Sequence, residues 1–379
     1  MKPEYERPEI RLGDRIIGSD EGVFVIAEIG INHNGSVHEA AKLIDTAAEC
    51  GADAVKFQSF RADHLLICSN DRYAQQNGEE SAYDLLRRCE LSFDEQEKLK
   101  EHADRLGIIF LSTPFDNESV DFLDRIGVPA FKVASGDITH VPLLRHIAAK
   151  GKPVFLSTGM SYLDEVIETV RRLRDGGAPE ILLMHCTASY PASSGDMNLR
   201  ALETLQSYFG LLTGLSDHSR GILFSLAAAA MGAVAVERHF TLDRDATGPD
   251  HKASLDPNGL KKLVKNLRRL KAGMGSGEKR PAKSETDGRR LGRRSIVAAA
   301  DIQAGEQIVS DMLTCKRPGV GIAPKYRDQV AGMTPRRFIA KDTILTWEDL
   351  NPPVSPAPAE PRNDGFALQG SGNERHAGN

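Results

Sequence analysis

Eight short apolar runs recur along the first 240 residues, and polar side chains follow most of them within a few positions. The runs contain little polar alternation, which is typical of strands buried on both faces. The segments between them, such as 37–51, 93–107 and 163–177, carry apolar residues at helical spacing and glycine at or near their ends. The runs occupy 23–30, 54–58, 108–114, 130–136, 154–159, 181–187, 211–218 and 233–240.

This alternation predicts an α/β fold with a parallel sheet, because parallel neighbours need a helical crossover between them. Eight such units in roughly 250 residues match the usual size of a closed (β/α)₈ TIM barrel. An open doubly wound sheet is the alternative. It is disfavoured because no GxGxxG follows the first strand and because polar residues follow nearly every strand.

The rest of the chain changes in composition. We expect the barrel to occupy 1–275, and a linker rich in Gly, Lys and Arg to occupy 276–292. Short β-like runs broken by Asp, Gly and Pro predict a small β-rich domain over 293–352. The Pro- and Gly-rich residues 353–379 are expected to be disordered.

Composition narrows the class of protein. The chain has 379 residues, 40% hydrophobic and 27% charged, and a net charge of -5. Because Lys and Arg are dispersed, we expect neither a nucleic-acid surface nor a membrane-binding face. The N-terminus lacks the apolar segment of a secretory signal, so a cytoplasmic protein is expected. Five cysteines without CxxC spacing predict reduced thiols rather than disulfides or a thiolate zinc site.

In such a barrel the C-terminal ends of all strands surround one mouth, so a polar residue that ends a run should face it. The last run ends in Glu237, Arg238 and His239, which we therefore place at the mouth. The same reasoning gathers there Glu28, Asn32, His33, Lys56, Gln58, Ser112, Thr113, Phe115, Lys132, Ser135, Ser157, Thr158, His185, Tyr190, Ser216, Asp217 and His218.

Two kinds of ligand site are predicted from this set. His218 and His239 close adjacent strands, and with oxygen ligands they suit a divalent metal that polarises a carbonyl, although a single histidine is often only a packed or capping residue. Lys56 and Lys132, with nearby hydroxyls, suit a phosphate or carboxylate. The alternative is that each lysine pairs with an acid or extends along the surface.

Other candidates are less determined by spacing. Glu28 is either a catalytic group or the structural partner of Lys56. Asp250, in the loop after the last strand, either contacts a polyol or a metal-bound water, or caps the next helix. The insertion 61–92 has the length of a lid or specificity loop, in which Asn70 and Tyr73 are candidates.

Ten ordered motifs between Arg11 and Leu350 resemble the sialic acid synthase family, and in particular its bacterial N-acetylneuraminate synthase branch. They are FVIAEIGINHNG, AVKFQ, FLSTPFD, KVASGDI, STGM, HCTASYP, GLSDH, ERHF, GPDHKASL and GRRSIVAAADIQAGE. The resemblance implies a TIM barrel followed by an antifreeze-like SAF domain. It also implies a homodimer in which each SAF domain is exchanged and covers the partner's active site.

The resemblance further implies condensation of phosphoenolpyruvate with N-acetylmannosamine and water, with release of phosphate. The alternative acceptor is 2,4-diacetamido-2,4,6-trideoxymannose, which would give N,N'-diacetyllegionaminate. By its motifs, His218 and His239 would bind Mn²⁺ (or Mg²⁺ or Co²⁺), and Glu28 and Asp250 would orient the sugar and the water. Phosphoenolpyruvate would be held by Lys56, Thr113, Lys132, Ser135, Ser157, Tyr190 and Ser216, with Gln58 and Phe115 shaping the site. Arg294, with Arg293 beside it, would reach the sugar's N-acetyl group in the partner.

Two other hypotheses remain. A Schiff-base aldolase would need one buried lysine without a phosphate site, and the abundance of hydroxyl and lysine groups disfavours it. A non-catalytic protein would use the barrel as a scaffold. The presence of His218, His239 and Glu28 disfavours that reading.

Overall fold

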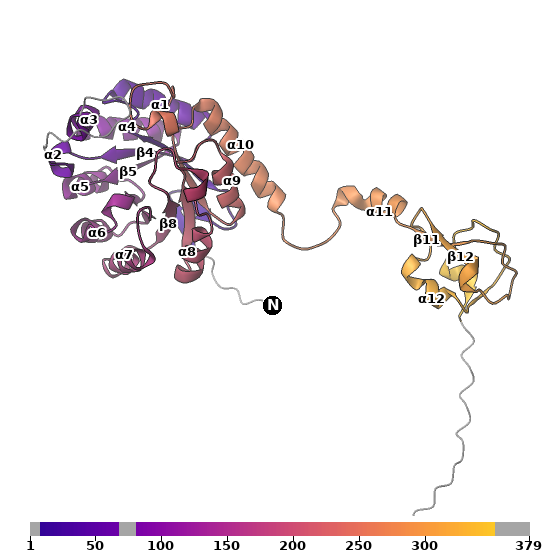
Figure 1. Ribbon diagram of the computed structural model, residues 1–379. Helices are drawn as coiled ribbons and strands as arrows, with labels where there is room; N and C mark the ends of the chain where they lie inside the picture. The colour runs from indigo at the N-terminus through magenta and orange to yellow at the C-terminus, as the bar shows by residue number, and fades with distance from the viewer. Residues whose placement is uncertain (1–7, 68–80, 353–379) are drawn as a thin grey trace, which may run out of the picture. The chain divides into compact units, whose positions relative to one another are not determined.

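The computed structural model describes residues 8–67 and 81–352, in two compact units, Met1–Gly277 and Glu278–Asn379. Figure 1 shows the first unit as a ring of helices around a sheet. Asn70, Tyr73 and the predicted tail over 353–379 lie outside the described residues.

An eight-stranded parallel sheet forms the centre of the first unit, in the order β5-β4-β3-β10-β9-β8-β7-β6. The two end strands of this order, β5 and β6, pack against each other and close the sheet. This confirms the predicted (β/α)₈ barrel. The strands are β3 (Phe24–Gly30), β4 (Ala54–Ser59), β5 (Ile109–Pro114), β6 (Phe131–Val133), β7 (Val154–Ser157), β8 (Ile181–Cys186), β9 (Leu212–Ser216) and β10 (Ala235–His239).

Helices cover the outer face of this sheet (Figure 1). Their ends follow from local chemistry: Ser92 and Glu95 form a capping box at the start of α4, and Gly107 ends it with a φ of +71°. Buried apolar side chains of these helices pack on the outward side chains of the strands. The helices are α1 (Val37–Glu49), α2 (Ala62–Leu65), α3 (Ala82–Cys89), α4 (Phe93–Leu106), α5 (Asn117–Arg125), α6 (Val141–Ala148), α7 (Leu163–Asp175), α8 (Ala201–Phe209), α9 (Leu223–Ala230) and α10 (Pro257–Met274).

An antiparallel hairpin that the sequence did not predict precedes the barrel. It consists of β1 (Glu9–Leu12) and β2 (Arg15–Gly18). Ile10 and Ile17 are buried in one cluster with Phe24 and other residues near the N-terminal ends of the barrel strands. The hairpin therefore adds apolar packing at that end, and the polar residues that follow the strands lie at the opposite end.

The second unit has a small core of its own, which includes Ile296, Ile308 and Leu345. Its strands pair antiparallel, β11 (Ser295–Ala298) with β12 (Leu313–Lys316) and β13 (Thr334–Pro335) with β14 (Leu350–Asn351). A four-residue helix, α12 (Arg327–Val330), packs among them. The predicted linker contains a short exposed helix, α11 (Thr286–Gly292).

Within 8–67 and 81–352, no helix is both long enough and apolar enough to cross a bilayer. No disulfide joins Cys50, Cys89, Cys186 and Cys315, the cysteines of these two ranges.

Candidate active site

The alternation of side chains along β10 separates its polar residues into two environments. Glu237 and His239 lie with the lysines and histidines of the other strands, as predicted. Arg238 is turned the other way, because successive residues of a strand point to opposite faces. Its Nη1 lies 2.6 Å from Oδ2 of Asp217, to which Ser225 of α9 also donates a hydrogen bond. The prediction that Arg238 and Asp217 face the mouth is therefore wrong.

Ser112 shows the same effect on β5. Its hydroxyl lies 2.7 Å from that of Ser59, which in turn donates to Gln96 of α4. Ser112 therefore belongs to the layer between sheet and helix. The next residue, Thr113, points inward and accepts a hydrogen bond from Lys56.

A buried ionic cluster occupies the C-terminal end of the barrel. Lys56 Nζ lies 2.7 Å from Oε2 of Glu28 and 3.9 Å from Oε1 of Glu237. It also donates to Thr113 Oγ1 at 3.1 Å, and Ser216 donates to Glu237 at 2.9 Å. Each of these five side chains is at most 5% exposed. Lys56 therefore pairs with an acid, which the sequence left as the alternative to an anion site, and two carboxylates share it.

The second buried lysine, Lys132, has no carboxylate within ion-pair distance among the described residues. Its Nζ donates to Ser157 Oγ at 2.5 Å and to the Val133 carbonyl at 3.1 Å. Ser135 lies nearby and accepts a hydrogen bond from the Gly159 amide. A Cβ at position 159 would lie 2.8 Å from Ser135 Oγ, so glycine allows this close approach.

The two carboxylates of the cluster have opposite pKa shifts. Burial raises the pKa of Glu28 to about 7, although Lys56 opposes the shift. Burial also disfavours the ionised form of Glu237, but attraction to Lys132 and Lys56 outweighs it and lowers the pKa to about 2. Near neutral pH, Glu237 is therefore a fixed negative charge, whereas Glu28 is able to gain or lose a proton.

His218 and His239 converge as predicted, with ring centroids 5.3 Å apart. The ring of Tyr190 lies against that of His218, with centroids 4.2 Å apart and the planes tilted by 36°. Burial lowers the pKa of His218 to about 4 and that of His239 to about 3, so both imidazoles are neutral near pH 7. His239 Nδ1 is buried without a hydrogen-bond partner among the described residues, and Asp250 Oδ2 lies 3.6 Å from it.

These features fit the needs of a metal site in part. Neutral imidazoles are the form that binds metals. His218 Nδ1 lies 2.9 Å from the Thr187 carbonyl, a hydrogen bond that leaves Nε2 with its lone pair available. Over 8–67 and 81–352, however, no group of three or more His, Cys, Asp or Glu side chains is arranged to hold an ion. The two histidines would therefore supply part of a coordination shell, with substrate and water completing it.

Gly30 positions Glu28, Gln58 and Asp250 around one point. It follows a break in the β3–β4 register and has a φ of +55°. A Cβ there would lie 3.1 Å from Glu28 Oε1, 3.6 Å from Gln58 Nε2 and 3.7 Å from Asp250 Oδ2. Because three separate segments meet at this glycine, a side chain at position 30 would disturb all three.

Two further predicted residues make their contacts within their own units. Phe115 is half-buried and packs edge-on against Phe60. Arg294 is an exposed side chain of the second unit, with Nη1 3.5 Å from the Cys315 carbonyl.

Sequence reasoning assigned no role to two residues of the site. Glu237 was placed at the mouth only as part of a motif, although it links both lysines electrostatically and accepts from Ser216. Cys186 was taken as structural, yet its Sγ lies 3.7 Å from His218 Nδ1. The signal that would have found both is strand periodicity, since each has the same parity as an inward residue of its strand.

Two family models match the chain. The NeuB family matches residues 43–279, and the SAF domain matches residues 293–351. The N,N'-diacetyllegionaminic acid synthase of Legionella pneumophila is 44% identical over 88% of this chain and 96% of its own length. The N-acetylneuraminate-9-phosphate synthase of Mus musculus is 37% identical over 80% of this chain and 85% of its own.

A solved structure of a related enzyme also aligns with this chain. The N-acetylneuraminic acid (sialic acid) synthetase of Leptospira borgpetersenii, crystallised with citrate, aligns with a TM-score of 0.68 and 36% identity. The alignment covers 75% of this chain and 96% of that one. These matches span the barrel that carries the buried lysines, carboxylates and histidines as well as the small C-terminal domain. The chain belongs to the NeuB family of nonulosonic acid synthases and carries a C-terminal SAF domain.

Proposed function

We propose that this protein condenses phosphoenolpyruvate with an open-chain N-acetylated sugar and water, forming a nonulosonic acid and releasing phosphate. The observation that carries the proposal is the presence of two buried lysines, Lys56 and Lys132, at the C-terminal end of a NeuB-family barrel, together with a carboxylate, Glu28, that pairs with Lys56 and has a pKa of about 7. Lysines supply the charge that an anionic substrate needs. A carboxyl group that titrates near neutrality suits proton transfer during its reaction.

The charges of the cluster favour an anion. With Glu28 protonated, the charge of Glu237 opposes that of Lys56, whose pKa is raised, and a bound anion would stabilise the charged form of Lys132, whose pKa burial lowers. Lys132 lacks a carboxylate partner in the described chain, so the phosphate group of phosphoenolpyruvate is assigned to Lys132, Ser157 and Ser135. The carboxylate of phosphoenolpyruvate is assigned to Lys56 and to the hydroxyls of Thr113 and Ser216, which supply neutral donors.

Glu28, Gln58 and Asp250 are assigned to the sugar and the water, because these three polar side chains meet at Gly30. In the reaction, C3 of phosphoenolpyruvate bonds to the aldehyde carbon and water adds at C2. The resulting tetrahedral centre breaks its C–O bond to phosphate and leaves a ketone. The aldehyde oxygen gains a proton and the attacking water loses one. Glu28 can supply the first proton and accept the second, since its pKa allows both states.

His218 and His239 are the residues that would hold a divalent ion, with Mn²⁺ as the expected metal. When bound there, the ion supplies a positive charge that polarises the aldehyde carbonyl of the sugar. The support is the neutral state of both imidazoles and the buried, unpartnered Nδ1 of His239.

The acceptor was predicted from the sequence to be N-acetylmannosamine, with 2,4-diacetamido-2,4,6-trideoxymannose as the alternative. The comparisons favour the alternative, because identity to the N,N'-diacetyllegionaminic acid synthase is 44%, against 37% to the N-acetylneuraminate-9-phosphate synthase. The exchange of SAF domains in a homodimer, with Arg294 of one copy at the sugar of the other, remains a prediction. The exposure of Arg294 is compatible with it.

Phosphate release from phosphoenolpyruvate, measured with Mn²⁺ and each acceptor separately, tests the proposal. We expect release that depends on a sugar and is faster with the diacetamido acceptor. A Glu28→Gln variant keeps the size and hydrogen-bonding shape of the side chain and should lose most of the turnover. Release from neither acceptor by the wild-type protein, with its fold verified by circular dichroism, would contradict the proposed function.

A further inference from the structure

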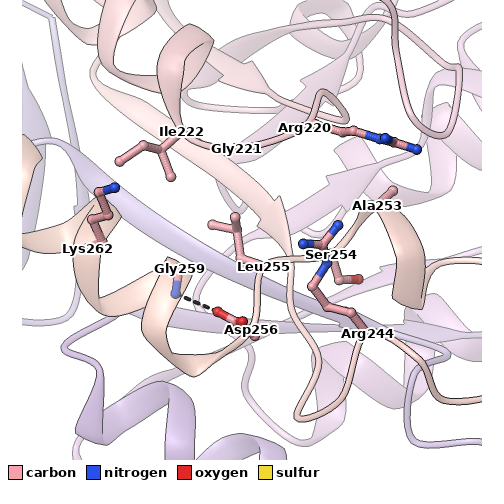
Figure 2. A pocket seen from close by; sticks show the side chains of 10 residues that line it. All are labelled: Arg220, Gly221, Ile222, Arg244, Ala253, Ser254, Leu255, Asp256, Gly259 and Lys262. Atoms are coloured by element: carbon pink, nitrogen blue, oxygen red, sulfur yellow. Dashed lines mark hydrogen bonds between the residues drawn. The ribbon is translucent and has the colours of Figure 1, made fainter.

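A cavity outside the active site is lined by three cationic side chains. It has a volume of about 230 Å³ and lies beside the loops that follow β9 and β10. Arg220 comes from the first loop, Arg244 from the second and Lys262 from α10. Figure 2 shows these three side chains around the pocket, with the apolar side chains of Ile222 and Leu255 between Lys262 and the arginines.

The positive charge of this cavity is largely uncompensated. Within 8–67 and 81–352, no carboxylate lies within ion-pair distance of Arg220, Arg244 or Lys262, and Arg244 donates only to the Lys252 carbonyl, at 3.0 Å. The single acid of the lining, Asp256, accepts a hydrogen bond from the Gly259 amide at 2.6 Å (Figure 2). It therefore caps α10, and the lining contains three cationic side chains but only one carboxylate, which is already engaged.

We propose that this cavity binds a small phosphate-bearing anion, either inorganic phosphate or a phosphomonoester. Two guanidinium groups and an ammonium group suit a dianionic tetrahedral ligand, because guanidinium pairs its N–H groups with two phosphate oxygens at once. The volume is below the roughly 300 Å³ at which pockets for drug-sized ligands begin, so the ligand is small. The loops after the seventh and eighth strands are also where barrels of this class frequently bind phosphate.

The site is separate from the proposed phosphoenolpyruvate site, whose lysines lie inside the barrel, but the same loops serve both. Arg220 follows Ser219, whose carbonyl accepts a hydrogen bond from the buried Arg238 and which lies next to His218 in sequence. Ser254, in the cavity lining, donates to the Asp250 carbonyl at 2.7 Å. An anion that bridges Arg220 and Arg244 would thus restrain the segments that carry His218 and Asp250.

Isothermal titration with inorganic phosphate, and separately with glycerol 3-phosphate, tests the proposal on the full chain. The variant is the double substitution Arg220→Gln, Lys262→Gln. Its matched control is Lys265→Gln, Arg269→Gln, which removes the same charge from exposed positions of α10 outside the cavity. A Lys132→Gln variant removes the proposed phosphate contact inside the barrel and separates the two sites.

We expect one or both probes to bind the Lys132→Gln variant. The same binding should weaken by about tenfold or more when the Arg220→Gln and Lys262→Gln changes are added, and stay unchanged with the control pair. The probe that binds more tightly identifies the source of the anion. Loss of all binding in the Lys132→Gln variant, or equal binding with and without the cavity substitutions, would overturn the proposal.

Hydrogen exchange on the wild-type protein gives a second readout that needs no variant. Phosphate should slow exchange of backbone amides in 219–223 and 251–256, the two segments that line the cavity. Slowing confined to the strand ends that carry Lys132 and Ser157 would contradict a second site. Because neither experiment measures turnover, both outcomes are independent of whether the proposed reaction is correct.

Discussion

Replacing Arg238 by methionine is expected to destabilise the barrel by several kcal/mol. Arg238 is 1% exposed, and its Nη1 lies 2.6 Å from Oδ2 of Asp217, the residue that follows β9. The substitution keeps an apolar stem of similar length but leaves the Asp217 carboxylate buried without its cation. Removing one partner of a buried pair costs about 3–5 kcal/mol. Asp217 keeps hydrogen bonds from Ser219 and Ser225, so we expect a value near the lower end, about 3 kcal/mol.

Urea unfolding of the full chain can separate the two units. Far-UV circular dichroism reports mainly on the barrel, which carries most of the helices. Trp347, the one tryptophan of the chain, lies in the second unit, so its fluorescence reports on that unit. The Arg238→Met change should lower the urea midpoint of the dichroism transition and leave the fluorescence transition in place.

Two further variants make the comparison quantitative. Arg171→Met breaks an exposed pair with Asp175, at 3.8 Å, and should cost less than about 1 kcal/mol. Adding Asp217→Asn to Arg238→Met removes the buried carboxylate charge that has lost its cation. The loss of unfolding free energy in the double variant should therefore be smaller, by at least about 1 kcal/mol, than the sum of the losses in the two single variants. If Arg238→Met costs no more than Arg171→Met, the buried pair does not stabilise the barrel as argued.

Three other predictions concern single side chains. Lys132→Gln should raise the KM for phosphoenolpyruvate by about tenfold or more and leave the KM for the sugar nearly unchanged, because the lysine is assigned to phosphate. Steady-state kinetics with each substrate varied in turn measure both constants, and an equal rise in the sugar KM would contradict the assignment. Gly30→Ala should lower kcat by about tenfold with an unchanged dichroism spectrum, because a methyl group at a φ of +55° would lie 3.1 Å from Glu28 Oε1; full activity would show that Glu28 does not depend on this contact. Burial lowers the pKa of His33 from 6.5 to about 4. Between these two pH values the imidazole is protonated in the unfolded chain and neutral in the folded protein, so the free energy of unfolding should fall by up to about 3 kcal/mol as pH drops from 6.5 towards 4. His33→Asn keeps an acceptor for the Gly35 amide and should flatten urea midpoints over this range; an unchanged slope would mean that other groups cause the loss.

The barrel was predictable because its strands are almost entirely buried and most of them are followed by an amphipathic helix. The short hairpin Glu9–Leu12 and Arg15–Gly18 was not, since each strand has only four residues and lies in a segment with the charged composition of a surface terminus. Its side chains are buried only because the open end of a barrel lies beneath them, which no local pattern reveals.

The site shows a similar division. The positions of Lys56, Lys132, His218 and His239 follow from the rule that strand ends share one mouth. The directions in which Arg238, Asp217 and Ser112 point do not follow from it. The rule gives the position of a residue along the strand, but not the face of the strand on which its side chain lies. The pKa difference between Glu28 and Glu237 depends on distances to two lysines on other strands, so it becomes visible only in three dimensions.

The central claim is that this chain joins phosphoenolpyruvate to a sugar and expels phosphate by breaking the C–O bond at C2. The most direct test uses phosphoenolpyruvate labelled with ¹⁸O in the oxygen that bridges C2 and phosphorus, together with the preferred acceptor, and determines the masses of both products. The account predicts that the released phosphate carries the label and that the nonulosonic acid takes its ketone oxygen from water. Unlabelled phosphate, with the label retained in the organic product, would mean that the P–O bond breaks, and would contradict the mechanism assigned to these residues.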